Sequence, residues 1–190
     1  VLTAEKDGLV DAERTWVVTG RERHVAKVRP GGVGYPQRAI RTDKYLYIVN
    51  FKPERFPMGD PYNITDESAP DQKTLEGNTF ATAGDLDASP TKWWIVENRN
   101  DPKYSHFYDI AFGKRPREEL YVIGKNDPHQ MNNVAGELKH AEAKAELEKR
   151  LMAELKATGD PRVDEGECVF DKPPFVGDWQ RPKPKQKRKG

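Results

Sequence analysis

The chain has a single cysteine and few apolar residues. Cys168 has no second cysteine to pair with, so an internal disulfide and a cysteine-based metal cage are both excluded. Apolar residues make up 35% of the 190 residues and charged residues 33%, whereas ordinary globular domains have about 45–50% and about 25%. We therefore expect a hydrophobic core of modest size.

Net charge and long apolar runs are lacking too. The 32 Lys and Arg residues nearly balance the 31 Asp and Glu residues, and the net charge of +1 gives no general reason to expect a nucleic acid or another polyanion as partner. No apolar run approaches the roughly 20 residues of a membrane span, so we expect no membrane partner. The chain starts at Val1 without a charged and then apolar leader, and we expect a truncated or processed product.

Apolar patterns predict a small antiparallel sheet. Residues 16–19 form a short apolar run typical of a strand that is buried on both faces of a sheet. Residues 38–42 and 45–50 alternate on either side of a two-residue turn at 43–44, which predicts a tight antiparallel hairpin. A further strand is expected near residues 120–123.

Turn and cap residues predict helices in the middle of the chain. Prolines and glycines recur through residues 51–88, which indicates a long loop excursion away from the sheet. The pair Ser89-Pro90 is typical of an N-cap followed by the first helical position, and it predicts a helix through residues 93–96. The pair Asp101-Pro102 opens the next predicted helix.

A longer helix is predicted near the C-terminal end. Apolar side chains of residues 135–157 fall within one sector at helical spacing, and charged ones lie mostly elsewhere. An asparagine of the pair 132–133 is expected to cap this helix. The helix should lie on the sheet, with Leu151 and Leu155 near the isoleucines of the hairpin. The predicted fold class is therefore α+β, a small antiparallel sheet packed by a C-terminal helix.

Several short motifs resemble one enzyme family. They follow one another in the family's order, at residues 20–24, 34–42 with 44–48, 112–116, 119–135 and 158–162. The second is similar to the pattern Tyr-Pro-x-Arg-x-x-Arg-Thr followed by Tyr-x-Tyr-Ile. Together they resemble the C-terminal region of type I sulfatases, in particular the heparan N-sulfatase (sulfamidase) group of the alkaline-phosphatase superfamily.

The resemblance implies a sulfuric ester hydrolase or N-sulfatase of which this chain is only a part. Such enzymes use a formylglycine, made from a Cys/Ser-x-Pro-x-Arg motif, and a calcium ion, both on a large N-terminal α/β domain. The surroundings of Cys168 and Ser89 do not fit that motif. The chain is therefore expected to have no catalytic residue or metal ligand of its own and to be inactive alone.

The same resemblance implies a domain organisation, partners and a location. Residues 1–24 would be the last strand and site loop of the catalytic domain, residues 25–165 the sulfatase C-terminal subdomain and residues 166–190 a Pro/Lys-rich tail. The expected partners are the N-terminal catalytic domain and a sulfated carbohydrate, and the expected location is periplasmic or secreted.

The substrate-binding candidates follow the first predicted strand, because ligands of open α/β sheets gather beyond the carboxyl ends of strands. His24 could donate a hydrogen bond to a sulfate or a sugar hydroxyl, and Glu22 could accept one from an amine or a hydroxyl. Arg21 or Arg23 could pair with an anionic group. Arg38, at the start of the hairpin, is a further candidate.

An alternative explanation of these charges is structural. Arg21, Glu22, Arg23 and His24 would then pair with one another and with Arg38 or Arg41. For the whole chain, one alternative is a phosphohydrolase of the same superfamily. Another is a non-catalytic module that binds anions or polysaccharides through the basic tail.

Overall fold

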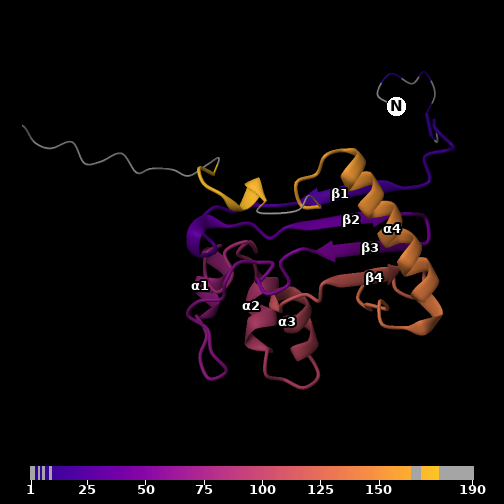
Figure 1. The fold of residues 1–190 in the computed structure, drawn as a ribbon. Helices are drawn as coiled ribbons and strands as arrows, with labels where there is room; N and C mark the ends of the chain where they lie inside the picture. The colour runs from indigo at the N-terminus through magenta and orange to yellow at the C-terminus, as the bar shows by residue number, and fades with distance from the viewer. Residues whose placement is uncertain (1–2, 4, 6, 9, 164–167, 176–190) are drawn as a thin grey trace, which may run out of the picture.

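The computed structural model describes residues 3, 5, 7–8, 10–163 and 168–175, and it shows an α+β fold (Figure 1). One antiparallel sheet has the strand order β1-β2-β3-β4. Its strands are β1 (Val17–Arg21), β2 (Gln37–Arg41), β3 (Tyr45–Asn50) and β4 (Glu118–Val122). The predicted fold class, a small antiparallel sheet with a C-terminal helix on it, is confirmed. The predicted tail, residues 166–190, lies outside the described residues except for 168–175.

The predicted hairpin is confirmed as β2 and β3. Ile40 lies opposite Tyr47 across the two strands. The turn is closed by the Thr42 backbone N–H, which donates to the Tyr45 carbonyl at 2.9 Å, and by the Thr42 hydroxyl, which accepts from the Tyr45 N–H at 3.0 Å. Local turn chemistry therefore sets the register of the strand pair.

The strand over residues 16–19 is placed differently from the prediction. It is β1, the edge strand of the same sheet, and it pairs with β2 alone. Val17 is 50% exposed, whereas Val18 packs against the core beneath the sheet. The expectation of burial on both faces is wrong, because an edge strand with one covered face leaves alternate side chains in solvent.

The C-terminal helix, α4 (Ala141–Ala157), crosses one face of the sheet (Figure 1). Its buried residues Leu147, Leu151 and Leu155 form one core cluster with four residues of the sheet, which are Ile40, Tyr47, Val49 and Leu120. The predicted packing on the hairpin is thereby confirmed at Ile40. Ile48 is outside this cluster, since it alternates with Tyr47 and Val49 along β3.

The start of this helix differs from the prediction. A short 3₁₀ turn, Leu138–His140, precedes α4, and residues 135–137 are not helical. Asn133 does not cap a helix, because its side-chain oxygen accepts from the backbone N–H groups of Leu120 at 2.9 Å and Ala135 at 3.0 Å. The Val134 N–H donates to the Leu120 carbonyl at 2.8 Å, so this segment lies along the outer edge of β4.

Three shorter helices are grouped beyond one end of the sheet (Figure 1). They are α1 (Gln72–Gly77), α2 (Pro90–Glu97) and α3 (Ser105–Phe112). The Ser89 hydroxyl caps α2 by accepting from the Lys92 N–H at 3.1 Å, as predicted. A second core cluster lies among them, formed by Leu75, Ala81, Ala83, Val96 and Phe112. None of the helices in the described ranges is long and apolar enough to cross a membrane.

Candidate functional site

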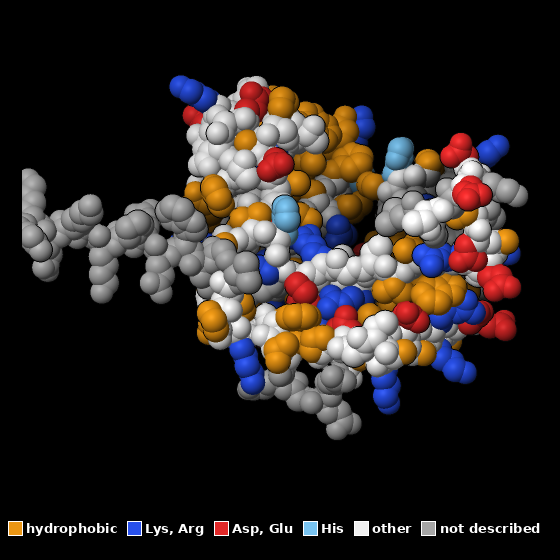
Figure 2. Space-filling model, turned by 90° about the horizontal axis from the view of Figure 1, so that it is seen from above, with side chains coloured by type: hydrophobic (Ala, Val, Ile, Leu, Met, Phe, Trp, Pro, Cys, Tyr) orange, Lys and Arg blue, Asp and Glu red, His pale blue; other side chains and the backbone are white. Residues whose placement is uncertain are grey.

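The carboxyl end of β1 brings together charged side chains from segments far apart in the sequence. Figure 2 shows Lys and Arg side chains interleaved with Asp and Glu side chains across the middle of this face. A hollow of about 440 Å³ lies there, between the end of β1 and residues 158–161. All four predicted binding residues lie at this end of the sheet, in two groups.

The first group is centred on Asp85, whose side chain is only 1% exposed. Its Oδ1 lies 2.5 Å from Nδ1 of His24, and its Oδ2 accepts from Nη2 of Arg21. The same Arg21 nitrogen donates to the Pro57 carbonyl at 2.9 Å. A buried carboxylate therefore orients both the histidine and the arginine.

The orientation of His24 has a chemical consequence. When Nδ1–H donates to the Asp85 carboxylate, Nε2 is an acceptor in the neutral ring and a donor in the protonated ring. The His24 side chain is 72% exposed, so this ring can reach a molecule in solution. The Arg21 Nε is buried and has no hydrogen-bond partner among the described residues.

The second group is centred on Glu22, which lies between two arginines. Its Oε1 accepts from Nη2 of Arg38 at 2.8 Å and from Nε of Arg162 at 2.9 Å. Its Oε2 accepts from Nη2 of Arg162 at 2.5 Å. The side chains of the two arginines are 7% and 3% exposed, so both ion pairs are largely removed from water.

Further carboxylates complete this second group. Asp160 binds Arg38, with its Oδ2 2.6 Å from Nε, and Asp171 binds Arg162, with its Oδ2 2.6 Å from Nη1. Arg55 also donates to Asp171, at 3.1 Å. Carboxylates and guanidinium groups alternate along this network in equal numbers, so their formal charges cancel.

The structure thus separates the predicted binding residues by their surroundings. Arg21 and His24 are oriented by a buried carboxylate, and part of each remains accessible. Glu22 and Arg38 pair with each other, which is the arrangement the structural alternative anticipates. Arg41, the other arginine considered for that pairing, is exposed at the opposite end of β2.

Sequence reasoning missed the partners of these residues. Asp85 lies within the excursion 51–88, and nothing local marks it as a buried carboxylate. Asp160 and Arg162 lie in the motif at residues 158–162, but Arg162 is 140 positions from Glu22. No pattern of local spacing reports a contact of that range.

The described residues include no group of three His, Cys, Asp or Glu side chains that could hold a metal ion. The calcium and the formylglycine, which the resemblance implies for a preceding domain, stay predictions.

Low pH should weaken the ion pairs of the second group, the network centred on Glu22. Burial alone would raise the pKa of Asp160, but hydrogen bonds from the Arg38 side chain and the Arg162 backbone outweigh it and hold that pKa below its ordinary value of 3.8. A lowered carboxyl pKa stabilises the fold above about pH 4, and this stability is lost as the pH falls through the lower, folded-state pKa. We expect the unfolding free energy, measured in urea at pH 5 and pH 3, to fall on acidification.

Asp160→Asn isolates the contribution of this carboxylate. The variant should be less stable at pH 5, and its stability should depend less on pH below 4, by up to about 1.4 kcal/mol per pH unit. Equal pH dependence of the variant and the wild type would contradict the assignment.

No family model matches the chain, and none of the curated proteins compared with it is similar in sequence. The resemblance to sulfatases therefore rests on the motifs at residues 20–24, 34–42 with 44–48, 112–116, 119–135 and 158–162.

Proposed function

We propose that this chain is the C-terminal part of a type I sulfatase of the heparan N-sulfatase-like group, and that it binds a sulfated glycan through Arg21 and His24. The intact enzyme would hydrolyse sulfate esters or N-sulfates. One observation carries the role of these two residues: the buried Asp85 carboxylate orients both at the end of β1, with the His24 ring exposed. The motif order supports the family.

Glu22 and Arg38 have a different role in this proposal. Every nitrogen of the Arg38 guanidinium already donates to the protein: Nε to Asp160, Nη2 to Glu22 and Nη1 to the backbone carbonyls of Arg21 and Gln37. No donor of Arg38 is left for a substrate. The bond to the Arg21 carbonyl, at 3.1 Å, makes Arg38 a positioning residue that fixes the backbone from which the Arg21 side chain projects.

The contribution of the chain to the reaction is binding and orientation. In the intact enzyme, the formylglycine and calcium of the preceding domain would supply the nucleophile and much of the charge stabilisation. Arg21 would pair with a sulfate or carboxylate of the glycan. His24 would present Nε2 to a sulfate oxygen or a sugar hydroxyl, and Asp85, whose Oδ1 lies 2.5 Å from Nδ1, would keep the ring in that orientation.

Replacing His24 tests this role. In the intact enzyme, His24→Ala should lower kcat/KM for a sulfated oligosaccharide by a factor that corresponds to about 1.5–3 kcal/mol, the loss of a charge-assisted hydrogen bond. The melting temperature should stay nearly unchanged, because the side chain is 72% exposed. His129→Ala, at another exposed histidine, is the matched control and should change neither quantity.

The opposite pattern would remove His24 from the substrate site. A lower melting temperature with wild-type kinetics would mean that the His24–Asp85 pair only stabilises the fold. The gene upstream of Val1 tests the enzyme class separately. If it lacks a Cys/Ser-x-Pro-x-Arg motif, the sulfatase proposal fails and the non-catalytic anion-binding module remains.

A further inference from the structure

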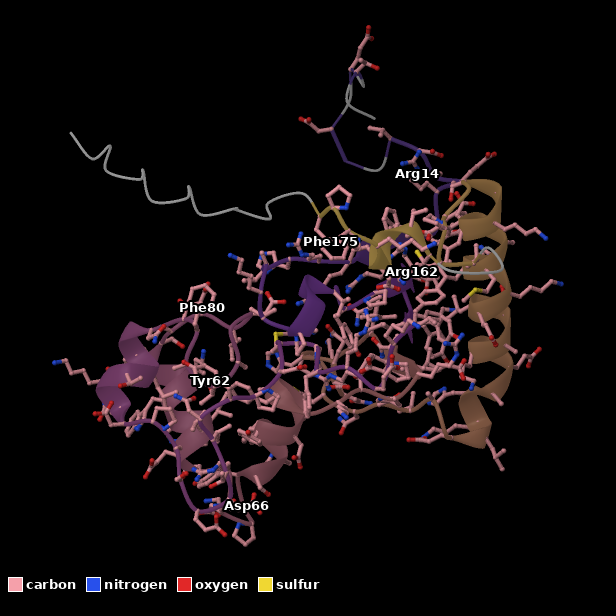
Figure 3. The ribbon with its side chains drawn as sticks, turned by 60° about the vertical axis from the view of Figure 1, so that its left-hand side comes forward. Arg14, Tyr62, Asp66, Phe80, Arg162 and Phe175 are labelled. Atoms are coloured by element: carbon pink, nitrogen blue, oxygen red, sulfur yellow. The ribbon has the colours of Figure 1, made fainter. Side chains whose placement is uncertain are left out.

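A second hollow, of about 530 Å³, lies on the loops that lead to Asp85. Three segments line it, at residues 27–32, 60–62 and 80–84. The last of these segments is followed directly by Asp85. Two aromatic side chains, Tyr62 and Phe80, come from facing loops on this side of the molecule (Figure 3).

Backbone hydrogen bonds hold the three segments together. The Asp60 N–H donates to the Val28 carbonyl at 2.9 Å, and the Tyr62 N–H donates to the Thr82 carbonyl at 3.0 Å. The Asp85 N–H donates to the Met58 carbonyl at 3.0 Å. Because these bonds join all three walls, the hollow is formed without a ligand.

The buried side chain of Val28 fills the space behind the hollow, and two glycines fit around it. A Cβ atom at Gly59 would lie 2.9 Å from Val28 Cβ, and one at Gly84 would lie 2.8 Å from Val28 Cγ1. Only glycine allows the loops to approach Val28 this closely. The part of the wall around Val28 is therefore closely packed.

The loop that carries Phe80 contains a strained residue. Thr82 has φ +61°, a left-handed conformation that is rare for a β-branched residue. Its hydroxyl donates to the Ala81 carbonyl at 2.7 Å, and its N–H donates to the Asn63 side chain at 3.3 Å. Strain of this kind persists only where the surrounding structure enforces it, and it is common at ligand-binding loops.

Tyr62 and Phe80 present much of their aromatic side chains to solvent. They are 54% and 56% exposed, and neither belongs to the second core cluster among the three short helices. Single exposed aromatic residues are common, but these two line one preformed hollow. The rim carries a cation, Lys27, and a carboxylate, Asp60. Apolar walls with a few charged groups at the edge are typical of sites for small ligands.

We propose that this hollow binds a pyranose ring of the glycan chain, next to the sugar that His24 contacts. The apolar face of the ring would stack on Phe80 and Tyr62, Asp60 would accept hydrogen bonds from ring hydroxyls, and Lys27 would pair with an acidic substituent. Arg29, the third charged residue of the lining, donates its guanidinium hydrogen bonds to the backbone carbonyls of Phe56 and Pro57, which leaves Lys27 and Asp60 with opposite charges for the ligand. The choice of a glycan rests on the proposed function, whereas the hollow itself does not.

Binding of two matched probes to the full chain tests this inference. The probes are a heparin-derived hexasaccharide and the same hexasaccharide after desulfation and N-acetylation. Amide resonances are followed by NMR at two places, Gly31 and Gly84 for the hollow and residues 21–24 for the His24 site. Both probes should shift the resonances of the hollow, because stacking does not require sulfate, and only the sulfated one should also shift residues 21–24.

Substitutions of the two aromatic residues test whether their side chains bind the sugar in the hollow. Phe80→Ala and Tyr62→Ala should each weaken binding of the desulfated probe about tenfold. Their melting temperatures should stay close to that of the wild type, since both side chains are exposed. Trp94→Ala, at a partly exposed aromatic residue of α2 outside the hollow, should bind like the wild type.

The outcomes separate the two proposals. If neither probe shifts Gly31 and Gly84 at millimolar concentration, or if Phe80→Ala and Tyr62→Ala bind like the wild type, the inference is overturned. Shifts at residues 21–24 alone, with the sulfated probe, would overturn it while the proposed function survives. Shifts at the hollow with both probes, and none at residues 21–24, would support the hollow and contradict the sulfated-glycan site.

Discussion

Replacing Lys92 by methionine should destabilise the protein by about 3 kcal/mol or more. The side chain is 1% exposed, and its ammonium donates to the carbonyl oxygens of Thr79, Ala83 and Leu86 at 2.8, 3.0 and 2.7 Å. Burial lowers the pKa of Lys92 to about 8, so the group is still charged at pH 7 and these bonds are charge-assisted. Methionine would leave three acceptors without a donor, each at a cost of about 1–3 kcal/mol.

Urea unfolding at pH 7 measures this effect, with Lys73→Met as the control. Lys73 is an exposed residue of α1, and its replacement should change the unfolding free energy by less than about 0.5 kcal/mol. If the unfolding free energy of Lys92→Met falls by less than about 1 kcal/mol, water molecules must donate hydrogen bonds to the three carbonyl oxygens in place of the ammonium. The loop that Lys92 holds carries both Phe80 and Asp85, so a destabilised loop should also weaken the two sites proposed for the glycan.

The parts of the fold that depend on local patterns were predictable. The alternation around Thr42 and Tyr45 predicted the hairpin, and Ser89-Pro90 predicted the cap of α2. The apolar sector of α4 predicted that Leu151 and Leu155 face the sheet. In each case the information lies within a few residues, where side-chain period and cap chemistry act directly.

Contacts over long range escaped prediction. The first turn of the predicted C-terminal helix fails because Asn133 bonds to Leu120 of β4, a residue of another element. Helix α1 was missed inside a Pro- and Gly-rich segment, although Asp71 caps it by accepting from the Thr74 N–H at 2.9 Å. Lys92 occupies a helical position where a lysine is ordinarily exposed, and only the loop folded over α2 makes it buried.

The candidate site likewise has one part that was predictable from local sequence and another part that depends on contacts over long range. Residues 21–24 were recognisable as a charged cluster at the end of a strand, but their roles depend on partners supplied by distant segments. Asp85 makes His24 and Arg21 an oriented pair, and Arg162 makes Glu22 part of an ion-pair network. Sequence alone therefore left binding and structural roles open for Glu22.

Glu22→Gln should settle that role through stability, with an expected loss of about 3–5 kcal/mol. The carboxylate lies between Arg38 and Arg162, whose side chains are almost completely buried, and breaking a buried ion pair leaves an uncompensated charge. Burial alone would lower the pKa of Arg162, but its hydrogen bonds to Glu22 and Asp171 raise it, so the network favours the charged form. Urea unfolding of the full chain measures the loss.

The control is a glutamate that pairs with an arginine in water. Glu146 on α4 lies 3.2 Å from Arg150, one helical turn away, and its side chain is 69% exposed. Glu146→Gln should cost at most about 0.5 kcal/mol, as exposed pairs do. A similarly small loss in Glu22→Gln, together with a lower kcat/KM in the intact enzyme, would contradict the structural role and return Glu22 to the residues that contact the substrate.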